Sequence, residues 1–194
     1  MDMDVVNPYF RSADYADVLA ASGVRVLGPN FANSNLDTPS LPAAMGDAIT
    51  DGECVIIDVG GDDAGSTALG VYSRQLSQSD PDVMYVINRY RSQTTSPEDA
   101  VEILREIEGT ARIRATCIVN NSHLKGLTTE ETILGSMPFA ERVSELTGLP
   151  IRFTTAPVGA VPLNRVPLLY QVGVHVRAPW EQAGNRVAHG NSQQ

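Results

Sequence analysis

The residues best suited to chemistry are acidic side chains placed at the ends of short apolar runs. Asp58 follows the run Val55, Ile56, Ile57, and Gly60 and Gly61 come one residue further along. In open α/β sheets, ligands bind beyond the carboxyl ends of the strands. An aspartate there can hold a Mg²⁺-bound water, and glycines let backbone amides approach a phosphate. A plain structural role fits equally well, with the aspartate capping the next helix and the glycines forming the turn.

A second pair of carboxylates, Asp2 and Asp4, lies in the opening stretch MDMDVVNPYFRS. Side chains alternate along an extended strand, so both carboxylates would point to the same side. Paired carboxylates near a phosphate can bind a metal or orient a water molecule. The alternative interpretation is a solvated terminus with no chemical role.

Polar residues also follow two other apolar runs. Asn120 and Asn121 come after one of them, and an asparagine side chain offers both a donor and an acceptor to a nucleobase edge. Arg89 and Arg91 come after the other and could bind an anion. The alternatives are turn asparagines that satisfy loop backbone and arginines that are solvated surface charges. No G-x-S-x-G motif occurs, so a hydrolase triad is not predicted.

Short apolar runs rich in Val and Ile predict the strands that would position these residues. Most runs are near-continuous, which is typical of a parallel sheet covered on both faces. Cys54 and Cys117 lie inside two of the runs and are predicted to be buried, reduced thiols. The predicted strands are residues 24–27, 54–59, 83–87, 113–119, 151–154 and 169–176.

Helical patterns alternate with these runs and predict an α/β fold. The clearest helix opens at Ser96 and runs to about Glu108, with Pro97 at its first position and acidic residues in its first turn. Other helices are predicted at 12–21, from Thr129 onward, and at 138–147. Residues 30–42 are predicted to be a surface loop.

The bulk composition limits the class of protein. A length of 194 residues suits one domain, predicted at 1–176, followed by a polar, disordered tail at 177–194. The formal net charge of −9 argues against a broad nucleic-acid-binding surface, and Lys125 is the only lysine. No run approaches the roughly 18 apolar residues of a membrane span. The predicted location is the cytoplasm, since no signal-peptide pattern is present.

Three motifs, taken in order, resemble the ParA/MinD-type P-loop NTPases. They are DMDVVN at residues 2–7, VIIDVGG at 55–61 and IVNN at 118–121. This deviant-Walker branch also includes CobQ/CobB-like and nitrogenase iron-protein-like ATPases, and the resemblance covers about residues 1–155. A longer run that begins DVVNPYFRSADYADVL is similar to an uncharacterised subgroup of ATP-binding proteins. The resemblance implies a three-layer, mostly parallel sheet with helices on both faces.

The resemblance also implies a function and site residues. Members act as nucleotide-dependent switches that bind ATP and Mg²⁺, and their nucleotide lies across a homodimer interface. Asp4 would be the catalytic switch I aspartate that orients the attacking water. Asp2 would lie near Mg²⁺, and Asp58 would be the Walker B aspartate that holds it through water. Gly60 and Gly61 would form switch II, and Asn120 would lie by the adenine. The residues implied to contact the nucleotide are therefore Asn7, Gly60, Gly61, Asn120 and Asn121.

One family feature does not occur in this sequence. No G-x-x-x-x-G-K-[ST] motif is present, and the family carries that loop ahead of the D-x-D segment. The expectation is therefore a domain without its first β-α unit, inactive as an ATPase, through truncation or through genuine degeneration. Two alternatives stay open: a non-catalytic protein-interaction or regulatory module, and a CobQ/CobB-like or dethiobiotin synthetase-like ATP-dependent metabolic enzyme.

Overall fold

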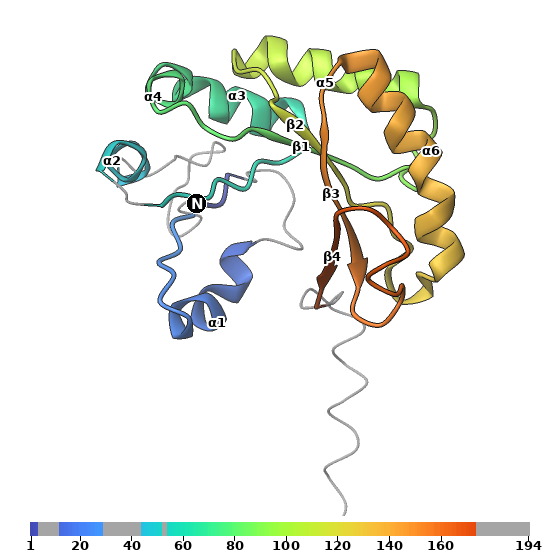
Figure 1. The fold of residues 1–194 in the computed structure, drawn as a ribbon. Coiled ribbons are helices and arrows are strands. Elements are labelled where there is room, and N and C mark those ends of the chain that lie inside the picture. Colours follow the sequence, from blue (N-terminus) through green and yellow to red (C-terminus); the bar gives the residue numbers. More distant parts are fainter. Residues whose placement is uncertain (4–11, 29–43, 52–53, 174–194) are drawn as a thin grey trace, which may run out of the picture. The chain divides into compact units, whose positions relative to one another are not determined.

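The computed structural model describes residues 1–3, 12–28, 44–51 and 54–173. They fall into two compact units, one within Met1–Gly60 and the other Gly61–Gly173. Figure 1 labels the helices and strands of both units.

The Gly61–Gly173 unit is built on a parallel sheet. Its strands are β1 (Met84–Ile87), β2 (Cys117–Asn120), β3 (Ile151–Pro157) and β4 (Leu169–Val172), in the order β1-β2-β3-β4. All neighbouring pairs are parallel, and Ile87 at the end of β1 lies beside Asn120 at the end of β2. The predicted parallel α/β architecture is confirmed for this unit. The loops that follow β1 and β2 therefore emerge at the same edge of the sheet.

Helices α5 (Pro97–Ala111) and α6 (Glu130–Thr147) pack on one face of this sheet. Successive β-α-β connections of the same hand, added in one direction, place their helices on one face. The shared core holds Ile87 and Ile118 from the sheet, Val101 from α5 and Val143 from α6. Helix α3 (Asp63–Val71) contacts α5 in turn and leads into the short α4 (Ser73–Gln78).

Helix α5 begins as its sequence predicts. The Ser96 hydroxyl accepts a hydrogen bond from the Asp99 backbone N–H, and the Asp99 carboxylate accepts one from the Ser96 N–H, both 3.1 Å long. This reciprocal capping satisfies two of the backbone donors that a helix start leaves open. The helix ends slightly later than predicted, at Ala111, and Arg112 then takes a left-handed conformation with φ of 57°.

Helix α6 corrects the prediction of two separate helical segments, because one helix runs through Pro138. A proline inside a helix lacks the N–H that would bond the carbonyl four residues earlier. Phe139, Ala140 and Val143 directly beyond it are buried in the core, and their burial offsets that loss. The Thr129 cap at the start and left-handed Gly148 at the end agree with the sequence.

The Met1–Gly60 unit contains a 3-10 turn (Ser12–Tyr15), α1 (Ala16–Ala21) and α2 (Ala44–Asp51). The predicted strands at 24–27 and 54–59 were wrong as strands, although both segments lie beside residues 1–3. The Asp2 N–H donates to the Leu27 carbonyl over 2.7 Å, and a single parallel bridge joins Asp2 to Asp58. In the described residues these contacts are too few for a continuous ladder, and Ile56 remains 78% exposed.

The structure also corrects one of the two cysteine predictions. Cys117 on β2 is buried as predicted, whereas Cys54 is exposed. Its apolar neighbours predicted a buried strand, and that strand does not form around it. Strand β2 itself begins at Cys117 and not at residue 113. The predictions for 30–42 and 177–194 lie outside the described residues.

No helix among the described residues has the length and apolar character that crossing a membrane requires.

Candidate functional sites

In the Met1–Gly60 unit, Asp2 and Asp58 are held in register. The Met3 N–H donates to the Asp58 carbonyl and the Asp58 N–H donates to the Met1 carbonyl, both over 2.8 Å. This pair of bonds makes the parallel bridge between Asp2 and Asp58. Two acidic motifs that are distant in the sequence are thus neighbours in the fold.

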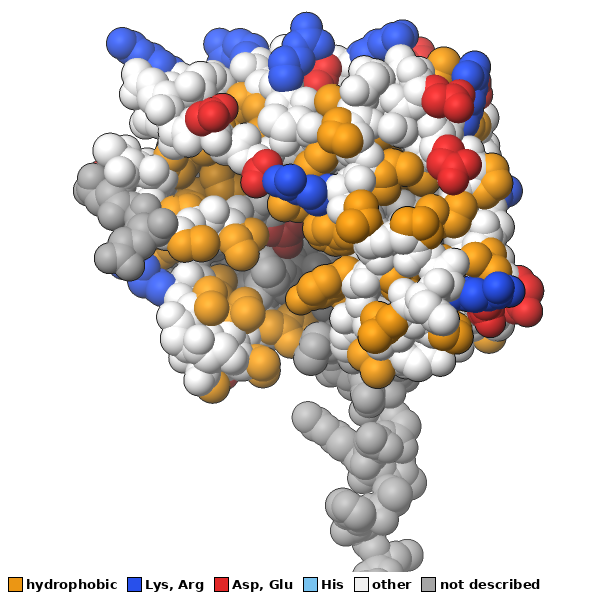
Figure 2. All heavy atoms as spheres, viewed as in Figure 1, with side chains coloured by type: hydrophobic (Ala, Val, Ile, Leu, Met, Phe, Trp, Pro, Cys, Tyr) orange, Lys and Arg blue, Asp and Glu red, His pale blue; other side chains and the backbone are white. Residues whose placement is uncertain are grey.

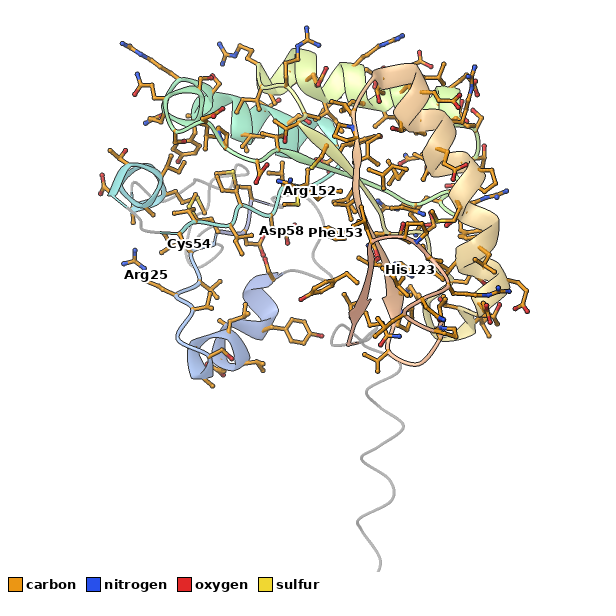
Figure 3. All side chains as sticks on the ribbon, in the orientation of Figure 1. Arg25, Cys54, Asp58, His123, Arg152 and Phe153 are labelled. Carbon is orange, nitrogen blue, oxygen red and sulfur yellow. The ribbon has the colours of Figure 1, made fainter. Side chains whose placement is uncertain are left out.

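The two aspartates have different surroundings. Asp2 is fully buried, while Asp58 is exposed and its Oδ2 accepts a hydrogen bond of 3.1 Å from the Ser12 hydroxyl. The Asp58 side chain is labelled in Figure 3. Of the two, only the Asp58 carboxylate is open to solvent, where it could hold a hydrated cation.

The Met1 amino group lies close to both carboxylates. It donates a hydrogen bond of 2.5 Å to the Ile56 carbonyl. Burial lowers the pKa of this amino group, and the negative charges of Asp2 and Asp58 act in the opposite direction.

The other predicted residues near Asp58 are divided between the units. Asp4 and Asn7 lie outside the described residues. Gly60 ends the first unit and Gly61 begins the second. The sequence offered helix capping as the alternative role of Asp58, but Asp62 caps the next helix, α3. Its side chain accepts a hydrogen bond from the Gly65 N–H over 2.8 Å. Asp58 is thus not the cap of the next helix.

Asn120 and Asn121, in the Gly61–Gly173 unit, are both engaged in internal hydrogen bonds. Asn120 is fully buried, and its amide donates to the Ser136 hydroxyl over 2.9 Å. Its Oδ1 accepts from the Ser122 N–H over 3.3 Å. The Asn121 Oδ1 accepts from the Thr155 hydroxyl over 2.6 Å. These bonds hold the end of β2 to α6 and β3. Only the bond from the Ser122 N–H is of the kind that the sequence left open, in which a turn asparagine satisfies loop backbone.

The arginines after β1 have separate roles. The Arg89 guanidinium donates to the Gly135 carbonyl in α6 and lies over the Tyr90 ring, 5.4 Å from its centroid. The Tyr90 hydroxyl also donates to α6, at the Thr132 carbonyl, over 2.7 Å. Arg89 therefore fixes its loop against α6, whereas Arg91 is exposed.

Mg²⁺ and ATP fit these residues only in part. Asp58 has the carboxylate chemistry and the exposure that a Mg²⁺-bound water needs. No group of three or more His, Cys, Asp or Glu side chains that could hold a metal occurs within the described residues. A P-loop lysine and its glycine-rich motif are also missing from the 194-residue sequence.

Several residues that shape these sites were not predicted from the sequence. Ser12 was predicted only as a helix start, yet its hydroxyl binds Asp58. Ser136 and Thr155 supply the partners of the asparagine pair. Such contacts join residues far apart in the sequence, and a single sequence carries no local signal for them. Asp62 could have been found, since an aspartate before a short polar turn is a common helix cap.

Comparisons of the chain with protein-family models, with curated proteins and with solved structures find no match.

Proposed function

We propose that this chain is a ParA/MinD-like ATP-binding domain that works as a nucleotide-dependent switch. The observation that carries the proposal is the parallel bridge between Asp2 and Asp58. The resemblance assigns these residues to two motifs that serve one Mg²⁺ ion, so they must be neighbours. The bridge supports the proposal because its backbone hydrogen bonds bring the two motifs together.

Each residue of the pair has a distinct part in this proposal. Exposed Asp58, oriented by the Ser12 hydroxyl, would hold Mg²⁺ through a water molecule. Buried Asp2 would fix the segment that leads to Asp4. A bound Mg²⁺ would neutralise charge on the phosphates. The sequence holds no P-loop to cradle those phosphates, so this chain alone should bind ATP weakly and turn none over.

Calorimetric titration of the chain with ATP, with and without Mg²⁺, tests the proposal. We expect weak binding that requires Mg²⁺ and is lost in Asp58→Asn. The matched control is Asp47→Asn, which removes the same charge from an exposed position in α2 of the same unit. Binding that is absent, or that both variants weaken equally, would contradict the proposal. ATP turnover by the wild-type chain that Asp58→Asn abolishes would contradict the expectation that this chain is inactive as an ATPase.

A second candidate, a protein-interaction module, is favoured by apolar side chains at the surface. Strand β1 is an outer strand of the described sheet, and two of its apolar side chains reach solvent: Met84 is 44% exposed and Val86 is 55% exposed. Hydrophobic side chains also reach the surface elsewhere on the face seen in Figure 2. Outer strands with apolar side chains are sites of pairing with another chain.

Sedimentation at several concentrations tests this second candidate with another copy of the chain as the partner. We expect self-association that Val86→Lys abolishes and that Val71→Lys, at an exposed position of α3, leaves intact. A monomer at all concentrations, together with Mg²⁺-dependent ATP binding, would favour the switch over the module.

A further inference from the structure

Two loops at the carboxyl edge of the parallel sheet are joined to each other in the Gly61–Gly173 unit. One follows β1 and the other follows β2. The Arg89 N–H donates to the Ser122 hydroxyl over 3.1 Å, and the Asn88 side chain donates to the His123 carbonyl over 3.4 Å. These bonds hold the two loops side by side at the sheet edge where α/β proteins bind ligands.

The first loop presents Arg91 on a fixed turn. The Asn88 carbonyl accepts from the Arg91 N–H over 3.2 Å and from the Thr94 hydroxyl over 2.6 Å. Arg91 is exposed, and none of the ion pairs among the described residues involves it. Its guanidinium therefore remains able to bind an anion, in contrast to that of Arg89.

The second loop presents His123 and Lys125. The Lys125 N–H donates to His123 Nδ1 over 3.1 Å, so the neutral imidazole carries its proton on Nε2. Lys125 has a φ of 54°, an uncommon conformation for a residue with a side chain. Thr128 holds the turn, because its hydroxyl accepts from the Leu124 N–H over 2.9 Å. The backbone thus keeps the imidazole and the lysine together in one short turn.

Lys125 and Arg91 both act electrostatically on His123. Burial is the largest cause of the lowered pKa of His123, followed by the positive charges of Lys125 and Arg91. Glu130, at the start of α6, pairs with Arg165 over 2.7 Å. Arg91 and Lys125 thus place two positive charges near His123 in a chain whose formal net charge is −9.

We propose that Arg91, His123 and Lys125 form a binding site for the phosphate group of a ligand. Arg91 would donate two hydrogen bonds from its guanidinium, Lys125 would supply a compact charge, and His123 would donate through Nε2–H. The site lies wholly within the Gly61–Gly173 unit and does not depend on the ATP-binding proposal. Arg89 is excluded because α6 and Tyr90 already engage its guanidinium.

Binding of inorganic pyrophosphate to the full chain at low salt tests the proposal. Calorimetry gives the affinity, and the His123 ring signals in proton NMR report the location. We expect the affinity of Arg91→Gln and of Lys125→Gln to fall about tenfold each, the loss of one charge-assisted contact. The matched control is Arg105→Gln, which removes an exposed charge from α5 of the same unit and should bind as the wild type does.

Further arms of the test distinguish the sources of the phosphate. Arg91→Lys should recover part of the binding, because the charge returns without the two-pronged geometry. Phosphatidylcholine vesicles containing a phosphoinositide show whether a lipid headgroup is also bound. No pyrophosphate binding, an equal loss in Arg105→Gln, or unchanged His123 signals on binding would each overturn the proposal. Vesicle binding without pyrophosphate binding would overturn it as well, since a membrane surface and not a phosphate group would then be recognised.

Discussion

The buried amide of Asn120 joins the end of β2 to α6. It donates to the Ser136 hydroxyl and accepts from the Ser122 N–H inside a fully buried site. Replacing Asn120 by Ala would leave the buried Ser122 N–H without this partner, which costs about 1–3 kcal/mol, whereas the Ser136 hydroxyl keeps its hydrogen bond to the Ile133 carbonyl. We expect Asn120→Ala to lower the free energy of unfolding in urea by an amount in that range. Asn120→Ala with unchanged stability would contradict the structural role assigned to this residue.

His123 gives the protein a dependence on pH. Its folded pKa lies below the ordinary value of 6.5, because burial, Lys125 and Arg91 disfavour the charged ring. The unfolded chain therefore binds the proton more readily, and stability falls as pH drops below about 6.5 toward the folded pKa. We expect the free energy of unfolding to decrease between pH 7.5 and pH 5.5, and this decrease to be smaller in His123→Asn. An identical decrease in both proteins would show that other groups cause it.

At the scale of elements, the start of α5 is the most local feature of the fold. The Ser96 hydroxyl and the Asp99 carboxylate cap the helix reciprocally. Ser96→Ala should cost about 1 kcal/mol of unfolding free energy in chemical denaturation. The matched control is Thr95→Ala, one residue earlier, where an exposed hydroxyl donates to Asp99 over 3.3 Å. A loss at Thr95 as large as the loss at Ser96 would contradict the capping role.

The sequence allowed the prediction of elements whose signals are local. The Ser96-Pro97 start of α5, the Gly148 end of α6 and the apolar run of β1 are short patterns, and all three are confirmed. Residues 54–59 have the same apolar character as β1 yet form one bridge, because a strand also needs a neighbour along its length. The boundary between the two compact units, at Gly60 and Gly61, is likewise set by contacts between residues distant in the sequence, which composition does not encode.

The candidate sites show the same limit. The sequence indicated Asp58 and the asparagine pair as residues at strand ends, and the structure places Asn120 and Asn121 there. It did not indicate that Asn120 would be fully buried against Ser136, because α6 brings that hydroxyl to it from a distant part of the chain. Arg91 and Lys125 follow different apolar runs in the sequence. Their association follows only from the parallel register of β1 and β2.

At the scale of the whole molecule, the two units differ in how their segments are held. In the Gly61–Gly173 unit, β2 is paired on both sides and its residues are 0–4% exposed, and the Ile118 N–H donates to the Pro150 carbonyl over 2.9 Å. In the Met1–Gly60 unit, the Asp58 N–H donates its hydrogen bond within a single β-bridge, and neighbouring residues are exposed. Local opening should therefore free the Asp58 amide without disturbing β2.

Hydrogen exchange measured residue by residue on the full chain tests this difference. We expect the Ile118 amide to exchange only through unfolding of its unit, and the Asp58 amide to exchange at least about 100-fold faster through local opening. If the switch proposal holds, Mg²⁺ and ATP should slow exchange at Asp58, because a ligand bound to one segment stabilises that segment first. Equal protection of the two amides without ligand would show that the Asp2–Asp58 bridge is part of a larger cooperative structure. Slower exchange at Ile118 alone would place nucleotide binding in the second unit and not at the acidic pair.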